Sequence, residues 1–266
     1  MEFRTIVDIP DPGFRIGACE EILFVGSCFA ESIGRRFAEE HFPVTINPYG
    51  VMYNPASVLH TIQRYEGSPR VVFITLGTNR IYRLKATGEI VDNCQKRPYN
   101  LFNEERLTVE KCVEFLVQAV DELLRRNADV QVVVTVSPIR YAKYGYHESQ
   151  LSKAVLLLAV RQLFLERKNV CYFPAYEIVL DELRDYRFYQ PDMIHPSQQA
   201  VEYIWERMAD VLFSHRTKQF IHDWQPIKAA LNHRPFHPES EDYQQFLAQA
   251  KANEQALLNQ YRPQLM

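Results

Sequence analysis

Short continuous apolar runs alternate along the chain with longer segments whose apolar residues recur at helical spacing. Continuous runs of this kind are typical of strands that are buried on both faces, and the longer segments indicate amphipathic helices. The predicted strands are residues 21–25, 70–76, 130–136 and 170–174. The predicted helices are residues 29–42, 56–65, 108–127, 151–168 (with Ser152 as N-cap) and 200–213.

Strands separated by helices of ten or more residues favour a parallel sheet, because parallel neighbours need long crossovers. We therefore predict a three-layer α/β/α sandwich with a mainly parallel sheet. Two segments depart from this order. Residues 43–69 are rich in turn formers and predict no regular element before residue 56, and residues 80–107 predict a β-hairpin followed by a loop.

The composition changes near residue 214, where the chain becomes polar, rich in glutamine and without a strand pattern. We expect one domain over residues 1–215 and a helical extension over residues 216–266 at the periphery of the sheet. The apolar positions of this extension form a narrow stripe, which suits a helix that covers another element rather than one that carries chemistry.

Charge and composition exclude several classes of partner. The 266 residues carry a formal net charge of -3 and no basic tract, so we expect neither nucleic acid nor an anionic membrane as partner. The N-terminus lacks the pattern of a secretory signal, and we expect a cytoplasmic protein. The five cysteines are odd in number and form no Cys-x-x-Cys pair, which predicts reduced thiols.

Polar residues follow three of the predicted strands. They are Gly26-Ser27-Cys28, Gly77-Thr78-Asn79 and the segment from Ser137 to Arg140. Because the carboxyl ends of parallel strands meet at one edge, where α/β sheets bind ligands, these residues are predicted to converge on one crevice.

The first of these turns carries a candidate nucleophile. The N-terminus of a helix favours negative charge, which suits a reacting thiol at Cys28. The competing interpretation makes Ser27 a simple helix N-cap and Cys28 a small buried apolar residue.

A candidate base lies near the end of the domain, in a loop bracketed by prolines. Asp192 stands three residues before His195, so its carboxylate can accept from Nδ1 while Nε2 faces a nucleophile. A surface turn or part of a metal site would give the same short motif. The remaining histidines form no spaced ligand set, and we expect no metal and no cofactor.

Two further residues at the same edge have alternative roles. The Asn79 carboxamide can donate to an oxyanion or simply belong to a turn. Arg140 can hold an anionic or polyhydroxyl substrate, or can pair with a carboxylate such as Asp192 or Glu177.

The assembled pattern resembles the SGNH (GDSL-type) hydrolase superfamily, in which an early Gly-Asp-Ser turn, a Gly-x-Asn-Asp segment and a late Asp-x-x-His supply the site. It is more closely similar to the GSCFA-domain family, which is named for the pentapeptide at residues 26–30. Further matching stretches are residues 47–55, 75–78, Asn93-Cys94, 137–140, 152–154 and 186–189 leading to Asp192 and His195. The resemblance covers about residues 20–215 and implies a flavodoxin-like sandwich.

The resemblance also implies site roles. Aligned on its glycine, Gly-Asp-Ser places the nucleophile at Cys28, and a slip of one residue places it at Ser27. The oxyanion donors implied are the Cys28 backbone, Gly50 and Asn79. Arg80 stands where the superfamily has its second acid, so the local charge differs.

These observations predict an enzyme that cleaves or transfers an acyl ester of a small molecule or carbohydrate through a covalent intermediate. Cys28 or Ser27 would attack, His195 would act as general base and acid, and Asp192 would orient it. Two alternatives remain open: a non-catalytic carbohydrate- or ligand-binding module, and a cysteine-dependent peptidase or transferase on the same fold. The sequence leaves open the acyl group, the alcohol, the acceptor and the oligomeric state.

Overall fold

The structure of the chain, a computed structural model, describes residues 4–92 and 97–261. The Asn93-Cys94 stretch noted above therefore lies outside the described residues. Within the described ranges, no helix has both the length and the apolar composition that a bilayer crossing requires.

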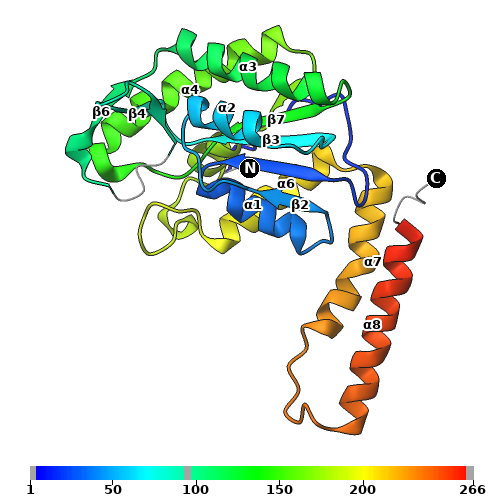
Figure 1. Cartoon of the computed structure of the whole chain (residues 1–266). Coiled ribbons are helices and arrows are strands. Elements are labelled where there is room, and N and C mark those ends of the chain that lie inside the picture. Colours follow the sequence, from blue (N-terminus) through cyan, green and yellow to red (C-terminus); the bar gives the residue numbers. More distant parts are fainter. Residues whose placement is uncertain (1–3, 93–96, 262–266) are drawn as a thin grey trace.

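A parallel five-stranded sheet forms the centre of the molecule, in the order β2-β1-β3-β7-β8 (Figure 1). Its strands are β1 (Ile22–Gly26), β2 (Val44–Ile46), β3 (Val71–Leu76), β7 (Gln131–Val136) and β8 (Val170–Tyr172). The register aligns Gly26 with Thr75 and Thr75 with Thr135, so the polar strand ends that follow lie at one edge of the sheet, as predicted.

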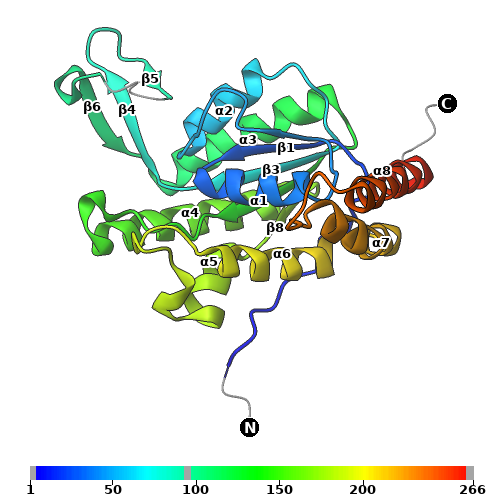
Figure 2. The ribbon, with the colours of Figure 1, turned by 90° about the horizontal axis from the view of Figure 1, so that it is seen from below.

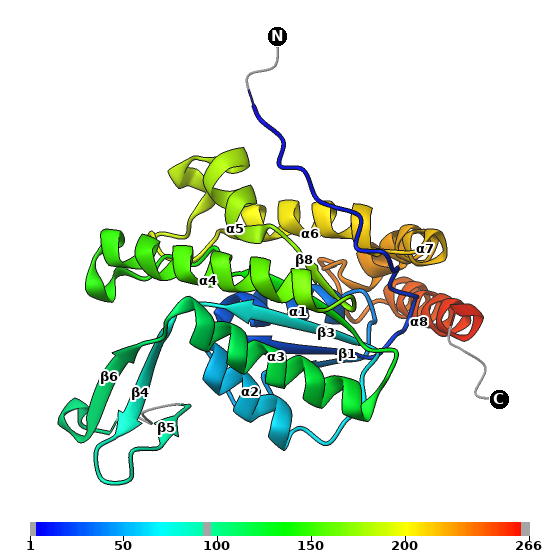
Figure 3. The ribbon, with the colours of Figure 1, turned by 90° about the horizontal axis from the view of Figure 1, so that it is seen from above.

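Helices cover both faces of this sheet, which confirms the three-layer α/β/α sandwich (Figure 3). One face carries α2 (Pro55–Arg64), α3 (Val109–Arg126) and α4 (Tyr146–Glu166). The other carries α1 (Cys28–Ala38), α5 (Ala175–Glu177), the π-helical turn η3 (Ile178–Leu183) and α6 (Gln198–Leu212). The domain also contains three short 3₁₀ turns: η1 (Tyr99–Leu101), η2 (Ala142–Tyr144) and η4 (Tyr186–Phe188).

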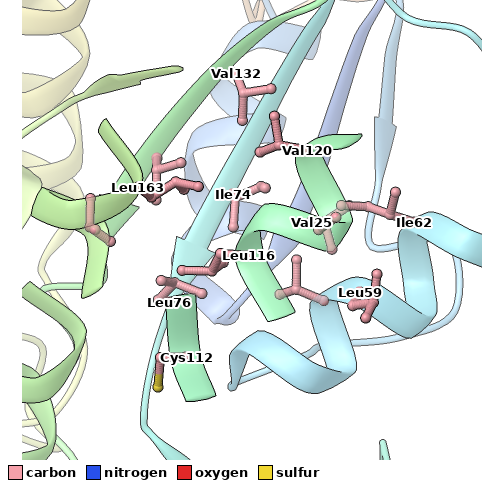
Figure 4. Close-up of a cluster of buried hydrophobic side chains, with 14 of the residues drawn as sticks. Val25, Leu59, Ile62, Ile74, Leu76, Cys112, Leu116, Val120, Val132 and Leu163 are labelled. Atoms are coloured by element: carbon pink, nitrogen blue, oxygen red, sulfur yellow. The ribbon is translucent and has the colours of Figure 1, made fainter. Parts of the chain in front are cut away.

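The alternation of side chains along each strand divides the core into two clusters. Leu23 and Val25 of β1 pack with α2, α3 and α4 (Figure 4), whereas Ile22 and Phe24 pack with α1 and α6. Successive strand residues point to opposite faces, so every position of β1 is buried. Each such side chain contributes about 1.5–3 kcal/mol relative to an exposed one, and this explains the continuous apolar runs in the sequence.

A small antiparallel sheet follows β3 and extends beyond the carboxyl edge of the central sheet (Figures 2 and 3). It contains β4 (Arg80–Leu84), β5 (Ile90–Val91) and β6 (Phe102–Arg106). The predicted hairpin is β4 and β5, but the segment interpreted as a loop contains β6. Four of the five β6 residues are polar and exposed, so the sequence carries no apolar alternation there. The three-residue β2 was missed for another reason: it is short, and turn formers follow it directly.

The N-cap predicted at Ser152 is wrong. Helix α4 begins at Tyr146, six residues earlier, and Ser152 lies buried within it. Its Oγ lies 3.0 Å from Thr78 Oγ1 and accepts the Asn79 N–H at 2.9 Å. A tertiary contact therefore accounts for this serine, which in sequence looked like a helix start.

The extension after the sandwich is helical, as predicted. Helices α7 (His215–Leu231) and α8 (Glu241–Tyr261) pack side by side as a hairpin that projects from the sandwich (Figure 1). Its buried apolar residues lie near the sandwich: Phe220, Trp224, Leu257, Leu258 and Tyr261. Trp224 Nε1 donates to the Glu39 carbonyl at 3.1 Å, which ties α7 to the end of α1.

Candidate functional site

The turn between β1 and α1 depends on a glycine. Gly26 has a φ of +141°, and a Cβ at this position would lie 2.1 Å from the Thr75 carbonyl oxygen. No other residue fits so close an approach of the β1 and β3 backbones. The turn therefore presses the next residue, Ser27, against β3.

Ser27 points into the protein. Its side chain is the N-cap of α1 and accepts the Phe29 N–H at 3.3 Å, while its Oγ lies 3.0 Å from Thr75 Oγ1. The residue is 1% exposed. Both hydrogen-bonding partners of this hydroxyl are thus internal, as expected of a structural cap.

Cys28 points outward from the same turn. It is half-buried, occupies the first position of α1, and has its Sγ 3.5 Å from Tyr53 Oη. The Tyr53 carbonyl accepts the N–H groups of Gly77 and Thr78 at 2.8 and 2.9 Å, which joins this tyrosine to the end of β3. Burial and the neighbouring thiol raise the pKa of Tyr53, so its hydroxyl keeps its proton and can donate to the sulfur.

Asp192 and His195 form a hydrogen-bonded pair. Asp192 Oδ2 lies 2.6 Å from His195 Nδ1, and its Oδ1 accepts the N–H groups of Ile194 and His195 at 2.8 and 3.0 Å. These hydrogen bonds lower the pKa of Asp192 to about 2, and the bond to the imidazole has the largest effect. The carboxylate therefore stays charged. With Nδ1 donating to the carboxylate, the neutral ring has Nε2 as its acceptor.

Arg140 fastens the loop that carries this pair. Its N–H donates to the Ile194 carbonyl and its Nη1 to the Met193 carbonyl, each at 3.0 Å. Neither carboxylate that the sequence suggested as its partner is used in this way: Asp192 bonds the imidazole, and Glu177 bonds a tyrosine hydroxyl at 2.7 and 2.8 Å. A substrate contact of Arg140 stays a prediction.

Helices α1 and α6 bring the Cys28 turn and the Asp192–His195 loop to the same edge of the sandwich (Figure 2). Arg36 Nε donates to Glu202 at 2.7 Å, and further along both segments the Phe42 and Phe213 rings lie 5.5 Å apart. Because the contacts follow the same order in both segments, the helices run parallel. Their N-termini, at Cys28 and just after the Asp-His loop, therefore lie on the same side of the sandwich.

The other two predicted oxyanion donors have partners within the protein. The Gly50 N–H donates to the Asn47 carbonyl at 2.8 Å, and one Asn79 Nδ2 proton goes to the Leu107 carbonyl at 2.7 Å. Asn79 is also 4% exposed. A role in oxyanion binding requires the Gly50 N–H to exchange its present acceptor, whereas Asn79 has a second Nδ2 proton beside the one that Leu107 accepts.

Lys153 is a residue of this region that the sequence analysis did not single out as functional. Its Nζ donates to the carbonyls of Gly77 and Ser137 at 2.8 and 2.7 Å, and the side chain is buried. Burial lowers the pKa of Lys153 to about 7. The sequence feature that could have identified Lys153 as buried is its position on the apolar face of the helix. It stands three residues before Leu156 and seven before Val160.

Titratable residues do not gather into a metal site in the part of the chain that the structure describes. No group of three or more His, Cys, Asp and Glu side chains there has the arrangement of a metal centre.

Several solved structures are similar to the sandwich. A protein from Parabacteroides merdae ATCC 43184, provisionally named a GDSL-like lipase, is 14% identical over 74% of this chain and 99% of its own, with a TM-score of 0.48. A member of the lipolytic protein G-D-S-L family from Veillonella parvula DSM 2008 is 13% identical over 72% and 97%, with a TM-score of 0.45. A carbohydrate esterase family 3 protein from Talaromyces cellulolyticus is 11% identical over 77% and 99%, with a TM-score of 0.43. A similarity of this degree carries no information about activity.

Family models match most of the chain, although no curated protein does. The model of the GSCFA family matches residues 21–70 and 67–208, which include the Gly26 turn, Lys153 and the Asp-His loop. A second model, for the C-terminal domain of GSCFA domain proteins, matches residues 224–263 in the helical hairpin. The chain belongs to the GSCFA family.

Proposed function

We propose that the protein cleaves or transfers acyl esters of a small molecule or carbohydrate, with Cys28 as the nucleophile. The observation that carries this proposal is the opposite orientation of two neighbouring side chains. The Ser27 hydroxyl is buried and bonded to Thr75, whereas the Cys28 thiol is half-buried and faces Tyr53. A reacting atom has to be reached by substrate, and this favours Cys28 over the Ser27 alternative.

The proposed reaction has two stages. His195 Nε2 takes the proton of the Cys28 thiol, and the thiolate attacks the ester carbonyl. The carbon–oxygen bond to the alcohol then breaks, and His195 gives this proton to the leaving alcohol. Water or a second alcohol then attacks the thioester while His195 takes up its proton, which releases the acid or the new ester and restores the thiolate. Asp192 holds the imidazole and stabilises its charged form.

The oxyanion that forms in each stage needs donors. The first N–H groups of a helix have no intrahelical acceptor, so the Cys28 N–H at the start of α1 can bind it. Gly50 and Asn79 are retained as the further donors that the family resemblance implies. Gly50 would have to change its acceptor, and Asn79 would donate its second Nδ2 proton. All of these groups belong to residues 1–215, and we assign the extension at 216–266 no part in the chemistry.

Turnover of p-nitrophenyl acetate tests the assignment of the nucleophile. Cys28→Ala should abolish turnover and the acetyl adduct detected on this residue by mass spectrometry. Ser27→Ala should keep the activity and lose about 1 kcal/mol of stability, the usual cost of a lost cap. Ser32→Ala is the matched control on α1, because Ser32 contacts the Cys28 carbonyl and not its thiol.

Two other results would change the proposal. An inactive Ser27→Ala together with an active Cys28→Ala would transfer the role to Ser27. If both variants matched the wild type on every ester tried, including thioesters and peptides, the protein would be the non-catalytic binding module of the alternative interpretation.

A further inference from the structure

A cavity of about 280 Å³ adjoins the candidate nucleophile. Tyr53, whose hydroxyl contacts the Cys28 thiol, lines it together with Tyr82 and Tyr99 of the small antiparallel sheet region and Tyr141 after β7. The small sheet extends from the carboxyl edge of the central sheet (Figure 3), and its residues Arg80, Tyr82 and Val91 line the cavity. The cavity is therefore built from separate segments that meet beside the site.

The two cations that line this cavity are already paired with carboxylates. Arg80 donates to Glu104 and to Glu148, each at 2.7 Å, and its side chain is 9% exposed. Lys143 Nζ donates to Tyr82 Oη at 2.6 Å and lies 3.8 Å from Glu104. Arg106 Nη2 also lies 2.7 Å from Glu148, so three cations share two carboxylates. Each cation that lines the cavity is held by a carboxylate, which weakens its attraction for an anionic ligand.

The negative charge of the cavity has a partner too. Asp92 lies 2.7 Å from His60 Nδ1, and this contact raises the pKa of His60. A cationic ligand would have to displace this imidazole. The rest of the lining is tyrosine faces and hydroxyls, the unused Nζ protons of Lys143, and four smaller side chains. These are two valines, Val51 and Val91, and two polar residues that bond within the protein, Asn54 and Thr78.

We infer that this cavity binds an uncharged polyhydroxylated ring, the alcohol part of the ester. A sugar ring has an apolar face of C–H groups that packs on an aromatic face, and hydroxyls at its edge that bond to tyrosine hydroxyls. Ligand cavities usually measure about 300–1,000 Å³, so this one admits a single ring. The Tyr53 and Tyr82 hydroxyls already have partners in the protein. An unbranched acyl chain would offer no hydrogen bond to the other two tyrosine hydroxyls, those of Tyr99 and Tyr141, whereas a sugar ring would.

Tyr99 is the tyrosine most suited to pack on such a ring, because it is 69% exposed. Its ring lies 4.7 Å from Lys143 Nζ, which is held in turn by Tyr82. Tyr186 provides a matched control, since it is 68% exposed and lies outside this cavity. A general effect of removing an exposed tyrosine would appear in both variants.

Binding by NMR saturation transfer tests the inference with three probes: methyl glucopyranoside, glucuronate and butyrate. All measurements use the Cys28→Ala protein, so that no turnover interferes. We expect the neutral glycoside to bind with a Kd on the order of 1 mM and more tightly than the other two probes. Tyr99→Ala should weaken it about three- to tenfold and Tyr186→Ala should leave it unchanged.

The assignment of the bound ring as the alcohol part of the ester rests on the proposed function. The experiment nevertheless distinguishes failure of the cavity assignment from failure of the proposed function. Absence of glycoside binding, a preference for glucuronate or butyrate, or equal binding by the Tyr99→Ala variant overturns the cavity assignment, even if Cys28 proves catalytic. Glycoside binding that depends on Tyr99, in a protein that hydrolyses no ester, would keep the cavity as a sugar site and reject the chemistry. Tyr82→Phe, which removes one hydroxyl and keeps the ring, should also weaken the glycoside and provides a second variant.

Discussion

The Nζ of Lys153 lies 2.7 Å from the carbonyl oxygen of Ser137, at the end of β7. The same nitrogen donates to the carbonyl of Gly77 after β3, at 2.8 Å. One buried amine from α4 therefore joins the carboxyl ends of two neighbouring strands directly beneath the proposed site. The arrangement positions the turns that carry the buried Thr78 and the partly exposed Arg140.

Replacement of Lys153 by Gln is expected to change how stability depends on pH. Burial holds the pKa of Lys153 at about 7, below the value of 10.5 for an exposed lysine. Between these two values the unfolded chain binds more protons than the folded one, so the free energy of unfolding of the wild type rises with pH. Relative to the Gln variant, the gain should approach about 1.4 kcal/mol per pH unit above pH 7.

Urea unfolding at pH 6 to 9 measures the free energy of unfolding of the wild type and of the Gln variant. The difference between the two cancels the contributions of the other titrating groups. A constant difference across the range would mean that Lys153 carries its charge equally in both states. Lys153→Met removes the donor as well, and should add a penalty that is independent of pH.

Gly26→Ala is expected to destabilise the protein by about 3 kcal/mol, since the new Cβ would lie 2.1 Å from the Thr75 carbonyl in addition to the strained φ. Gly50→Ala is the control: its φ is also positive, at +94°, but no atom lies within 4 Å of the added Cβ. It should cost about 1 kcal/mol. Equal losses in chemical unfolding would show that space at Gly26 is not the constraint.

Asp192→Asn is expected to lower the rate of ester cleavage about 10³-fold with little change in stability. The Asn oxygen can still accept the two backbone N–H groups that Oδ1 accepts now, so the loop keeps its shape. Its amide, however, donates toward His195 Nδ1 and forces the proton onto Nε2, which then cannot act as a base. Because the pKa of Asp192 is about 2, the wild-type rate should show no loss from this carboxyl between pH 4 and 7. A variant with wild-type kcat would remove Asp192 from the mechanism.

The Arg140 side chain is expected to act on the position of His195. Arg140→Met removes the bond to the Met193 carbonyl and should lower kcat about tenfold. Arg140→Lys, which can still donate to that carbonyl, should recover part of the loss. If KM rises instead and kcat is unchanged, Arg140 contacts the substrate, as its alternative role requires.

Brief iodoacetamide treatment at pH 7 is expected to modify Cys28 at least about tenfold faster than Cys112 and Cys171. Burial raises the pKa of both of those thiols to about 12, so they hold almost no thiolate at this pH. Mass spectrometry of the labelled peptides ranks all five cysteines, and His195→Ala should remove the advantage of Cys28. Similar rates for Cys28 in both proteins would show that the imidazole does not assist the thiol.

The sequence by itself determined the fold class and the meeting of three strand ends. Runs such as residues 70–76 have to be buried on both faces, and that condition requires helices above and below a parallel sheet. The order of strand and helix then places Gly26, Gly77 and Ser137 at one edge, whatever the details of packing. Local chemistry also predicted the Asp192–His195 pair, because its two members are only three residues apart.

Tertiary structure decided the rest, because contacts between distant residues do not follow a local period. Exposed and charged β6 is a strand through its pairing with β4, and Ser152 is an internal helix residue because it bonds to the turn after β3. Ser27 and Cys28 are neighbours, and the sequence favours the cysteine only slightly, through the alignment on Gly26 and the helix N-terminus. The close approach of β1 to Thr75 directs the serine hydroxyl inward. The thiol that remains at the helix start contacts Tyr53, a residue that lines the tyrosine-lined cavity.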